Sequence, residues 1–181
     1  FVSPLPSSEL RAGLDDEAAM GKFVLEMNQM PGIFILSCGK NMGVFKGVGY
    51  PADIAKLFRL SEYEGWMWVA HSRYPTNTPD SWFGAHPFTM LGTAFVHNGE
   101  ITSYGANVHW VEQYGYSCTM STDTEVLAYI YDKLQRDGLG VEEACSVMAP
   151  SLWTEISRTD DDRAKQLRQF YRGAVIIGPF A

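Results

Sequence analysis

The sequence predicts an α+β protein, because strand-like segments form one group and most helical segments follow them. Short apolar or alternating runs bounded by Gly, Asn and Pro predict strands at 33–37, 44–48, 66–71 and 93–97, with a further one at 174–177. Capped or amphipathic segments predict later helices at about 123–137, 141–148 and 161–170. This order favours an antiparallel sheet covered by helices over a chain of alternating β-α units.

Local signals mark the ends of several helices. Three acids at 15–17 precede a predicted helix that ends near Met27, since negative charge complements a helix N-terminus. A proline opens another helix over 51–60, in the first turn, where its missing N–H is tolerated. Thr122 and Glu125 have the spacing of a capping box, which predicts the start of the helix that runs to about residue 137.

Length and composition limit the class of protein. At 181 residues, with 46% hydrophobic and 19% charged residues, the chain suits one globular domain. The net charge of −7 and the scattered basic residues argue against a nucleic-acid partner. No apolar run reaches the roughly 18 residues of a membrane span, so we expect no membrane association. The odd cysteine count, without metal-like spacing, favours a cytoplasmic location.

We expect the boundaries of the domain to lie beyond both ends of this chain. The chain begins at Phe1 without an initiator Met, and it stops at Ala181 just after the predicted strand at 174–177. Residues 1–181 are therefore interpreted as a single domain that is incomplete at its N-terminus and at its C-terminus.

Polar residues suited to chemistry gather in four short segments, two of which follow predicted strands. These are HSRYPTNTP at 71–79, AHPF at 85–88, HNGEI at 97–101 and TDTE at 122–125. Each segment also has an ordinary structural interpretation, and the residues within it have to be weighed one by one.

Three positions in these segments have both a structural and a chemical interpretation. Arg73, where a strand enters a loop, suits an ordinary ion pair or the two-pronged binding of a carboxylate. Asp123, in a first helical turn, complements the helix dipole or binds an ammonium group. Asn98-Gly99 is a hairpin turn, or it presents a side-chain amide and a backbone N–H to one developing oxyanion. Together the chemical interpretations describe a site for an α-amino acid whose side-chain carbonyl is attacked.

The same residues carry a resemblance to a known family. HSRYPTNT, followed by Trp82, AHPF, HNGEI and then Gly-Ala-Asn at 105–107, resembles the glutaminase domain of glutamate synthase, a class II glutamine amidotransferase. The similarity in residue type, order and spacing extends from His71 to about Asp132. The STDTE segment resembles the archaeal-type branch, in which this domain is a separate subunit.

The resemblance implies a fold and a reaction. The fold is that of the N-terminal-nucleophile hydrolases, a four-layer αββα sandwich of two antiparallel sheets between helices. The reaction is hydrolysis of L-glutamine to L-glutamate and ammonia through a thioester, with ammonia passed to a synthase domain or subunit. The resemblance also implies that Arg73 holds the substrate carboxylate, that Asp123 holds its ammonium group, and that Asn98 and Gly99 bind the oxyanion. The resemblance implies as well that Thr76 adds a hydrogen bond to the substrate.

The sequence departs from that family at the nucleophile. There the nucleophile is a cysteine at the mature N-terminus, whose own α-amine is the general base, whereas this chain begins with Phe1. Cys38-Gly39 is similar to such a start, but an internal cysteine has no free amine, and this one follows an apolar run. We interpret Cys38, like Cys118 and Cys145, as a structural thiol. We expect the nucleophile, its strand and the start of the first helix to precede Phe1.

The remaining expectations concern ligands and partners. His71 and His97 end predicted strands, and we expect them to orient the loops that carry Arg73 and Asn98 rather than bind a metal, since no third ligand has regular spacing. No cofactor is expected in this domain; the resemblance implies FMN in the partner synthase, and a larger complex or homo-oligomer. Two alternatives stay open: an amidotransferase domain serving a synthase of sugar phosphates, purines or asparagine, and a non-catalytic glutamine-binding or assembly module.

Overall fold

The computed structural model describes residues 17–36, 42–72, 81–149, 151–173 and 176. Its α-helices are α2 (Glu17–Asn28), α3 (Pro51–Leu57), α4 (Tyr104–Glu112), α5 (Asp123–Arg136), α6 (Val141–Met148), α7 (Trp153–Ser157) and α8 (Asp162–Phe170). Two strands, β1 (Phe88–Met90) and β2 (Thr93–Phe95), and two short 3-10 helices, η1 (Leu60–Glu62) and η2 (Tyr171–Gly173), complete the described elements. The class is therefore α+β, as the sequence predicts.

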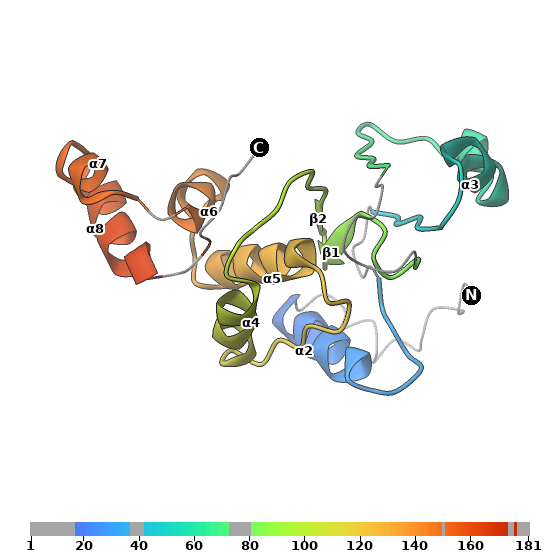
Figure 1. The fold of residues 1–181 in the computed structure, drawn as a ribbon, viewed down its shortest axis with the longest axis horizontal. Coiled ribbons are helices and arrows are strands. Elements are labelled where there is room, and N and C mark those ends of the chain that lie inside the picture. Colours follow the sequence, from blue (N-terminus) through green and yellow to red (C-terminus); the bar gives the residue numbers. More distant parts are fainter. Residues whose placement is uncertain (1–16, 37–41, 73–80, 150, 174–175, 177–181) are drawn as a thin grey trace.

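Helix α5 lies at the centre of the arrangement, with the β1–β2 hairpin at one end and α4 and α6 against its sides (Figure 1). Ten of its fourteen residues are buried, so it is a core helix rather than the one-sided amphipathic helix that the sequence predicts. Helix α2 contacts the last turn of α5, where the Arg136 guanidinium lies against Gly21. Helices α7 and α8 join the core through α6 and form the outer end of the molecule.

The polar side chains that α5 buries are paired. Asp132 accepts a 2.6 Å hydrogen bond from the Tyr116 hydroxyl and another of 2.6 Å from Nε of Arg136. Burial raises the pKa of Tyr116, and the negative charge of Asp132 raises it further, so the phenol stays protonated and remains a donor. These bonds allow a carboxylate to lie within the helical core without the full cost of an unpaired charge.

The hairpin turn is not where the sequence predicts it. Strands β1 and β2 pair antiparallel, with Met90 opposite Thr93, so the tight turn is Leu91-Gly92, and Leu91 has a φ of 50°. Asn98 has no regular secondary structure, Gly99 lies in a bend after β2, and neither residue has a positive φ. The interpretation of Asn98-Gly99 as a hairpin turn is wrong, because the chain beyond Gly99 enters a helix instead of a second strand.

Three predicted strands are not strands. Residues 33–36, 44–48 and 66–71 have no regular secondary structure, and the side chain of Trp66 is 90% exposed. Alternation alone does not make a strand, because a strand needs a neighbour to complete its hydrogen-bond ladder. In the described part of the chain only β1 and β2 pair, so the predicted four-layer sandwich of two sheets stays a prediction. The strand predicted at 174–177 falls outside the described residues, except for buried Ile176.

Two helices were not predicted. The α4 sequence contains Gly, Asn and valine residues of low helix propensity, and Ser103 at its N-cap has a φ of 60° and makes no capping bond with its side chain. Packing supports it instead: Val111 is fully buried against α5 and its neighbours. Helix α7 has only five residues, and the Glu155 carboxylate closes its first turn by accepting the Leu152 N–H at 2.8 Å.

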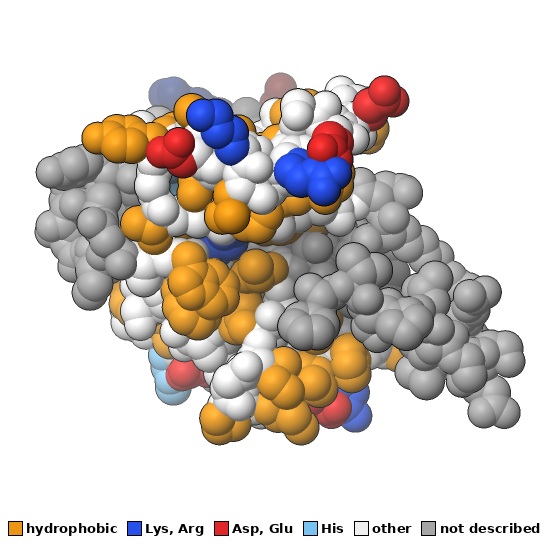
Figure 2. Space-filling view, turned by 90° about the vertical axis from the view of Figure 1, so that its right-hand side faces the viewer, with side chains coloured by type: hydrophobic (Ala, Val, Ile, Leu, Met, Phe, Trp, Pro, Cys, Tyr) orange, Lys and Arg blue, Asp and Glu red, His pale blue; other side chains and the backbone are white. Residues whose placement is uncertain are grey.

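Hydrophobic side chains are exposed on the face that carries α3 (Figure 2). They come from the segments around this helix: Val48, Tyr50, Leu57, Tyr63, Trp66, Met67, Trp68 and Val69. None of the helices in the described ranges is both long enough and apolar enough to cross a membrane.

The central position of α5 leads to a stability prediction. Leu134 is 1% exposed within the main cluster, so Leu134→Ala is expected to lower the free energy of unfolding by about 2 to 5 kcal/mol through lost burial and the cavity that remains. Urea denaturation monitored by circular dichroism measures the change. The control is Leu57→Ala on α3, where the side chain is largely in solvent and the change should be within about 0.5 kcal/mol. Equal effects of the two substitutions would contradict a core centred on α5.

Candidate active site

The N-terminus of α5 brings together residues that the sequence places apart. Thr122 caps the helix by accepting the Glu125 N–H at 3.2 Å, and Asp123 begins it with a side chain that is 25% exposed. Oδ2 of Asp123 accepts the Ile101 backbone N–H at 2.9 Å and lies 3.8 Å from Nδ1 of His97. The segment 97–101 is therefore hydrogen-bonded to the start of α5, and Asn98 and Gly99 lie near Asp123.

Asn98 and Gly99 are exposed on this segment, with the buried ring of His97 directly behind the glycine. A Cβ added to Gly99 would lie 2.9 Å from Nε2 of that ring, closer than side-chain atoms normally approach. Position 99 therefore has to be glycine while His97 keeps its place. An exposed amide and an exposed backbone N–H in succession can donate two hydrogen bonds to one oxygen atom.

Arg73 and Thr76 lie outside the described residues, but the chain that leads to them is described. The His71 ring packs 4.4 Å from the His86 ring, centroid to centroid, and Nε2 of His86 lies 3.2 Å from the Thr124 hydroxyl oxygen. The Thr124 hydroxyl also donates to Oδ1 of Asp123 at 3.2 Å. The segment that leads into Arg73 thus lies against the same helix end through a series of polar side chains.

Glu125 is the most deeply buried carboxylate of this region, at 1% exposed, and sequence reasoning assigned it only a capping role. Its two oxygens each accept a backbone N–H at 2.9 Å, from Thr119 and from Met120. The prediction that it closes a capping box with Thr122 is therefore half right: the Thr122 oxygen caps the helix, while the Glu125 carboxylate holds the preceding loop. Burial raises the pKa of Glu125, and the two N–H donors act against that rise.

Lys46 is a buried cation that sequence reasoning missed, because it falls within an alternating run where it should face solvent. Its Nζ donates to the Phe83 carbonyl at 3.2 Å, lies 3.8 Å from Sδ of Met120 and sits 4.3 Å above the Phe88 ring. Burial lowers the pKa of Lys46 to about 8, although the negative charge of Glu125 opposes the change. Lys46 thus joins the segment that precedes β1 to the loop before α5.

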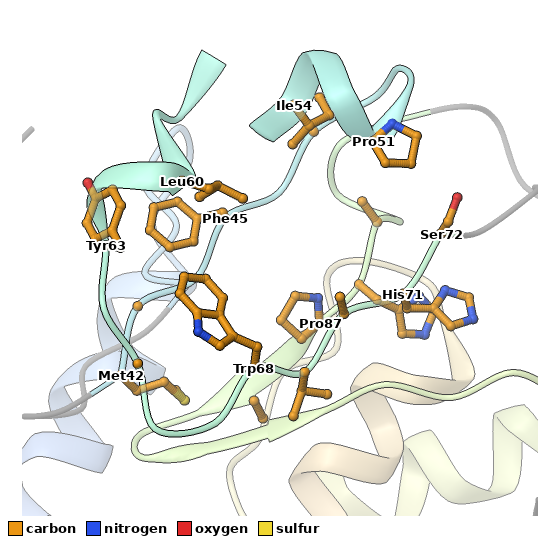
Figure 3. Close-up of a pocket in the computed structure, with 18 of the residues that line it drawn as sticks. Met42, Phe45, Pro51, Ile54, Leu60, Tyr63, Trp68, His71, Ser72 and Pro87 are labelled. Atoms are coloured by element: carbon orange, nitrogen blue, oxygen red, sulfur yellow. The ribbon is translucent and has the colours of Figure 1, made fainter. Parts of the chain in front are cut away.

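A cavity of about 820 Å³ lies beside this region, between α3 and the segment that leads to His71 (Figure 3). Phe45, Tyr63 and Trp68 line one side, and His71 and Ser72 lie at the opposite end. Among the described residues, the walls of the cavity do not include the 97–101 segment or the start of α5. The cavity is therefore adjacent to the predicted oxyanion and ammonium positions rather than part of them.

Cys118 is poorly suited to nucleophilic attack from within the fold. Cys118 is partly buried, and burial together with the charges of Glu125 and Glu112 raises the pKa of its thiol to about 12. It is therefore a protonated thiol at neutral pH. Cys145 is exposed on α6, and Cys38 lies outside the described residues. Within the ranges that the structure describes, His, Cys, Asp and Glu side chains form no group of three or more that could hold a metal ion.

The sequence of the region that carries this site matches a defined class of protein. Residues 18–122 match the model of the class-II glutamine amidotransferases, and the chain belongs to this family. The matched region includes Arg73, Thr76, Asn98 and Gly99, and it ends one residue before Asp123.

The chain is similar to three relatives from different organisms. The chain is 47% identical over 186 residues to an uncharacterised protein of Archaeoglobus fulgidus, a match that covers 99% of this chain and 49% of that protein. It is 32% identical over 105 residues to the isomerizing glutamine–fructose-6-phosphate aminotransferase of Acinetobacter baylyi, covering 58% of this chain and 17% of that protein. A candidate glutamine amidotransferase of Methanothermobacter thermautotrophicus is 26% identical over 160 residues, covering 80% of this chain and 52% of that protein. No solved structure matches the chain. The chain thus spans about half the length of the A. fulgidus relative.

The buried lysine leads to a pH prediction. The pKa of Lys46 is about 8 in the folded protein and near its ordinary value of 10.5 in the unfolded chain, so between these values the unfolded chain binds more protons and stability rises with pH. Lys46→Met removes this titration. The free energy of unfolding of wild type, measured relative to Lys46→Met, should rise by about 2 kcal/mol between about pH 7 and about pH 10.

Urea denaturation across that range tests the prediction. Taking the difference between the two proteins cancels the tyrosines and cysteines that titrate in the same range. Lys56→Met on α3 is the matched control, because Lys56 is exposed and should show no comparable trend. A difference between wild type and Lys46→Met that does not change with pH would show that the lysine is not buried as described.

Proposed function

We propose that this chain is the glutaminase domain of a glutamate synthase-type enzyme, which hydrolyses L-glutamine to L-glutamate and passes the ammonia to a synthase domain or subunit. The observation that carries the proposal is the hydrogen bond from the Ile101 N–H to Asp123, because it holds an exposed Asn-Gly pair beside a partly exposed carboxylate. Membership of the class-II amidotransferases supports the reaction, and the resemblance of the HSRYPTNT and STDTE segments supports the choice of synthase.

In the proposed site each residue binds one group of glutamine. The Asp123 carboxylate, still 25% exposed, binds the ammonium group, and Arg73 holds the α-carboxylate by two parallel hydrogen bonds. Thr76 adds one further hydrogen bond to the substrate. Asn98 and the Gly99 N–H donate to the carbonyl oxygen of the side-chain amide, which becomes negatively charged when the amide is attacked.

We assign the nucleophile to a cysteine at the mature N-terminus, as the resemblance implies, since the raised pKa of Cys118 makes that internal thiol a poor substitute. Its sulfur attacks the amide carbon while its α-amine takes the thiol proton. The amine then gives this proton to the amide nitrogen, the C–N bond breaks, and the nitrogen leaves as ammonia. Water then cleaves the thioester to give glutamate and regenerate the thiol.

The proposal extends to the setting of the domain. Residues 1–181 belong to one amidotransferase domain of the αββα type, which works in the cytoplasm within a larger complex or homo-oligomer. It needs no cofactor of its own, and the FMN of the reaction belongs to the partner synthase. A second candidate is transfer of ammonia to a sugar phosphate, favoured by the A. baylyi relative whose name gives fructose 6-phosphate as acceptor. Glutamine-dependent assays with 2-oxoglutarate plus a reductant, or with fructose 6-phosphate, separate the two.

The oxyanion assignment predicts the effect of Asn98→Ala. Loss of one oxyanion donor is expected to lower kcat for glutamine hydrolysis roughly 10² to 10³-fold with little change in KM, because the donor acts on charge that develops in the transition state. Ammonia release by the full-length protein is the measurement. Glu100→Ala, an exposed neighbour on the same segment, is the control and should keep wild-type turnover. Unchanged turnover in Asn98→Ala would contradict the assignment of Asn98 as an oxyanion donor.

The substrate-carboxylate assignment predicts a different kinetic signature. Arg73→Lys keeps the charge but loses the planar two-pronged contact, so KM for glutamine should rise at least about tenfold while kcat changes less.

Full-length wild type that releases no ammonia from glutamine would instead favour the non-catalytic module, and calorimetric titration with glutamine would then show binding without turnover.

A further inference from the structure

We propose that His97 is the positioning residue of the oxyanion site: its buried ring fixes the Gly99 backbone relative to Asp123. This inference rests on the proposed function and adds to it the side chain that sets the geometry of the donors.

The first observation is the burial of His97. Its side chain is 4% exposed, and Nε2 is fully buried without a hydrogen-bond partner among the described residues. A buried polar nitrogen without a partner costs free energy, and such atoms are uncommon in folded proteins. A purely space-filling role would be served better by an apolar side chain. The imidazole therefore has a role that compensates for this cost.

The second observation is the contact between the ring and Gly99. A Cβ at Gly99 would lie 2.9 Å from Nε2 and 3.4 Å from Cε1 of His97. The φ of Gly99 is outside the left-handed region, so the backbone itself does not require glycine at this position. The ring is what requires it. The absence of a side chain lets the Gly99 backbone rest on the imidazole, and this contact limits where its N–H can be.

The third observation is that the same ring faces Asp123. Nδ1 lies 3.8 Å from the Asp123 oxygen that accepts the Ile101 N–H. One side of His97 thus contacts the residue assigned to the substrate ammonium, and the other side contacts a residue assigned to the oxyanion. The ring sets the spacing between the two positions, so its loss should affect the transition state more than the binding of glutamine.

A double-mutant cycle in the full-length protein tests the inference. Gly99→Ala is expected to lower kcat at least about 100-fold in wild type, because the methyl group displaces the ring or the backbone. His97→Asn keeps an amide near the Nδ1 position but removes the rest of the ring. Alone it should lower kcat about tenfold, with KM for glutamine within about threefold. In the His97→Asn background, Gly99→Ala should cost less than about tenfold, since space has opened beneath position 99.

Two further variants define the comparison. His97→Gln places its amide near the Nε2 position, so Gly99→Ala should remain as costly in this background as in wild type. His109→Asn changes an exposed histidine on α4 and should leave turnover unchanged. The cycle is also measured by thermal melting, where Gly99→Ala should lower Tm more in wild type than in His97→Asn. If His97→Asn does not fold, the His97→Gln background decides: a Gly99→Ala cost below about tenfold there overturns the inference.

The outcomes separate the inference from the function on which it rests. If full-length wild type hydrolyses glutamine but Gly99→Ala lowers kcat by the same factor with and without His97, the positioning role is overturned and the proposed function stands. A rise in KM as large as the loss of kcat in His97→Asn also overturns the role. If wild type hydrolyses no glutamine, the proposed function and this inference fall together.

Discussion

The hydrogen bond from the Ile101 N–H to the Asp123 carboxylate is the constraint on which the rest of the site depends. It joins the end of the segment that follows the hairpin to the first turn of the central helix, across 22 positions of sequence. Because three residues of its first turn, 124–126, are buried, this turn supports that segment. The Asp123 carboxylate also accepts the Thr124 hydroxyl, whose oxygen lies 3.2 Å from Nε2 of His86. The segments that contain Ile101 and His86 are therefore both held against the same end of α5.

Buried charges around this helix end are arranged in a consistent way. Glu125 binds two N–H groups of the loop that precedes the helix, while Lys46 binds a carbonyl of the segment that precedes β1. A buried charge is tolerated only when its partners are fixed, so each of these side chains also fixes the loop it contacts. These contacts hold the chain near the start of α5, where Asp123 is partly exposed and accepts the Ile101 N–H. Rigid placement of donors is what electrostatic stabilisation of a transition state requires.

The family membership and the geometry account for different parts of the proposal. Class-II amidotransferase membership identifies the chemistry, and its matched region stops just before the central helix. The contacts of that helix explain how the matched residues are held. The name of the A. baylyi relative gives fructose 6-phosphate, and the name of the M. thermautotrophicus relative gives no acceptor. The proposed site binds glutamine rather than the acceptor, so the choice of a glutamate synthase rests on the sequence resemblance.

The sequence by itself determined the elements whose signals are local and the residues whose order is distinctive. The Pro51 helix, the Thr122 cap and helices α6 and α8 follow from capping and periodicity, and the HNG segment carried the resemblance. Tertiary structure decided whether extended segments became strands, because pairing depends on a neighbour that local pattern does not contain. It also decided the burial of Lys46 and the contact between His97 and Gly99. Both depend on contacts with side chains that are distant in the sequence, and the local sequence pattern does not specify these contacts.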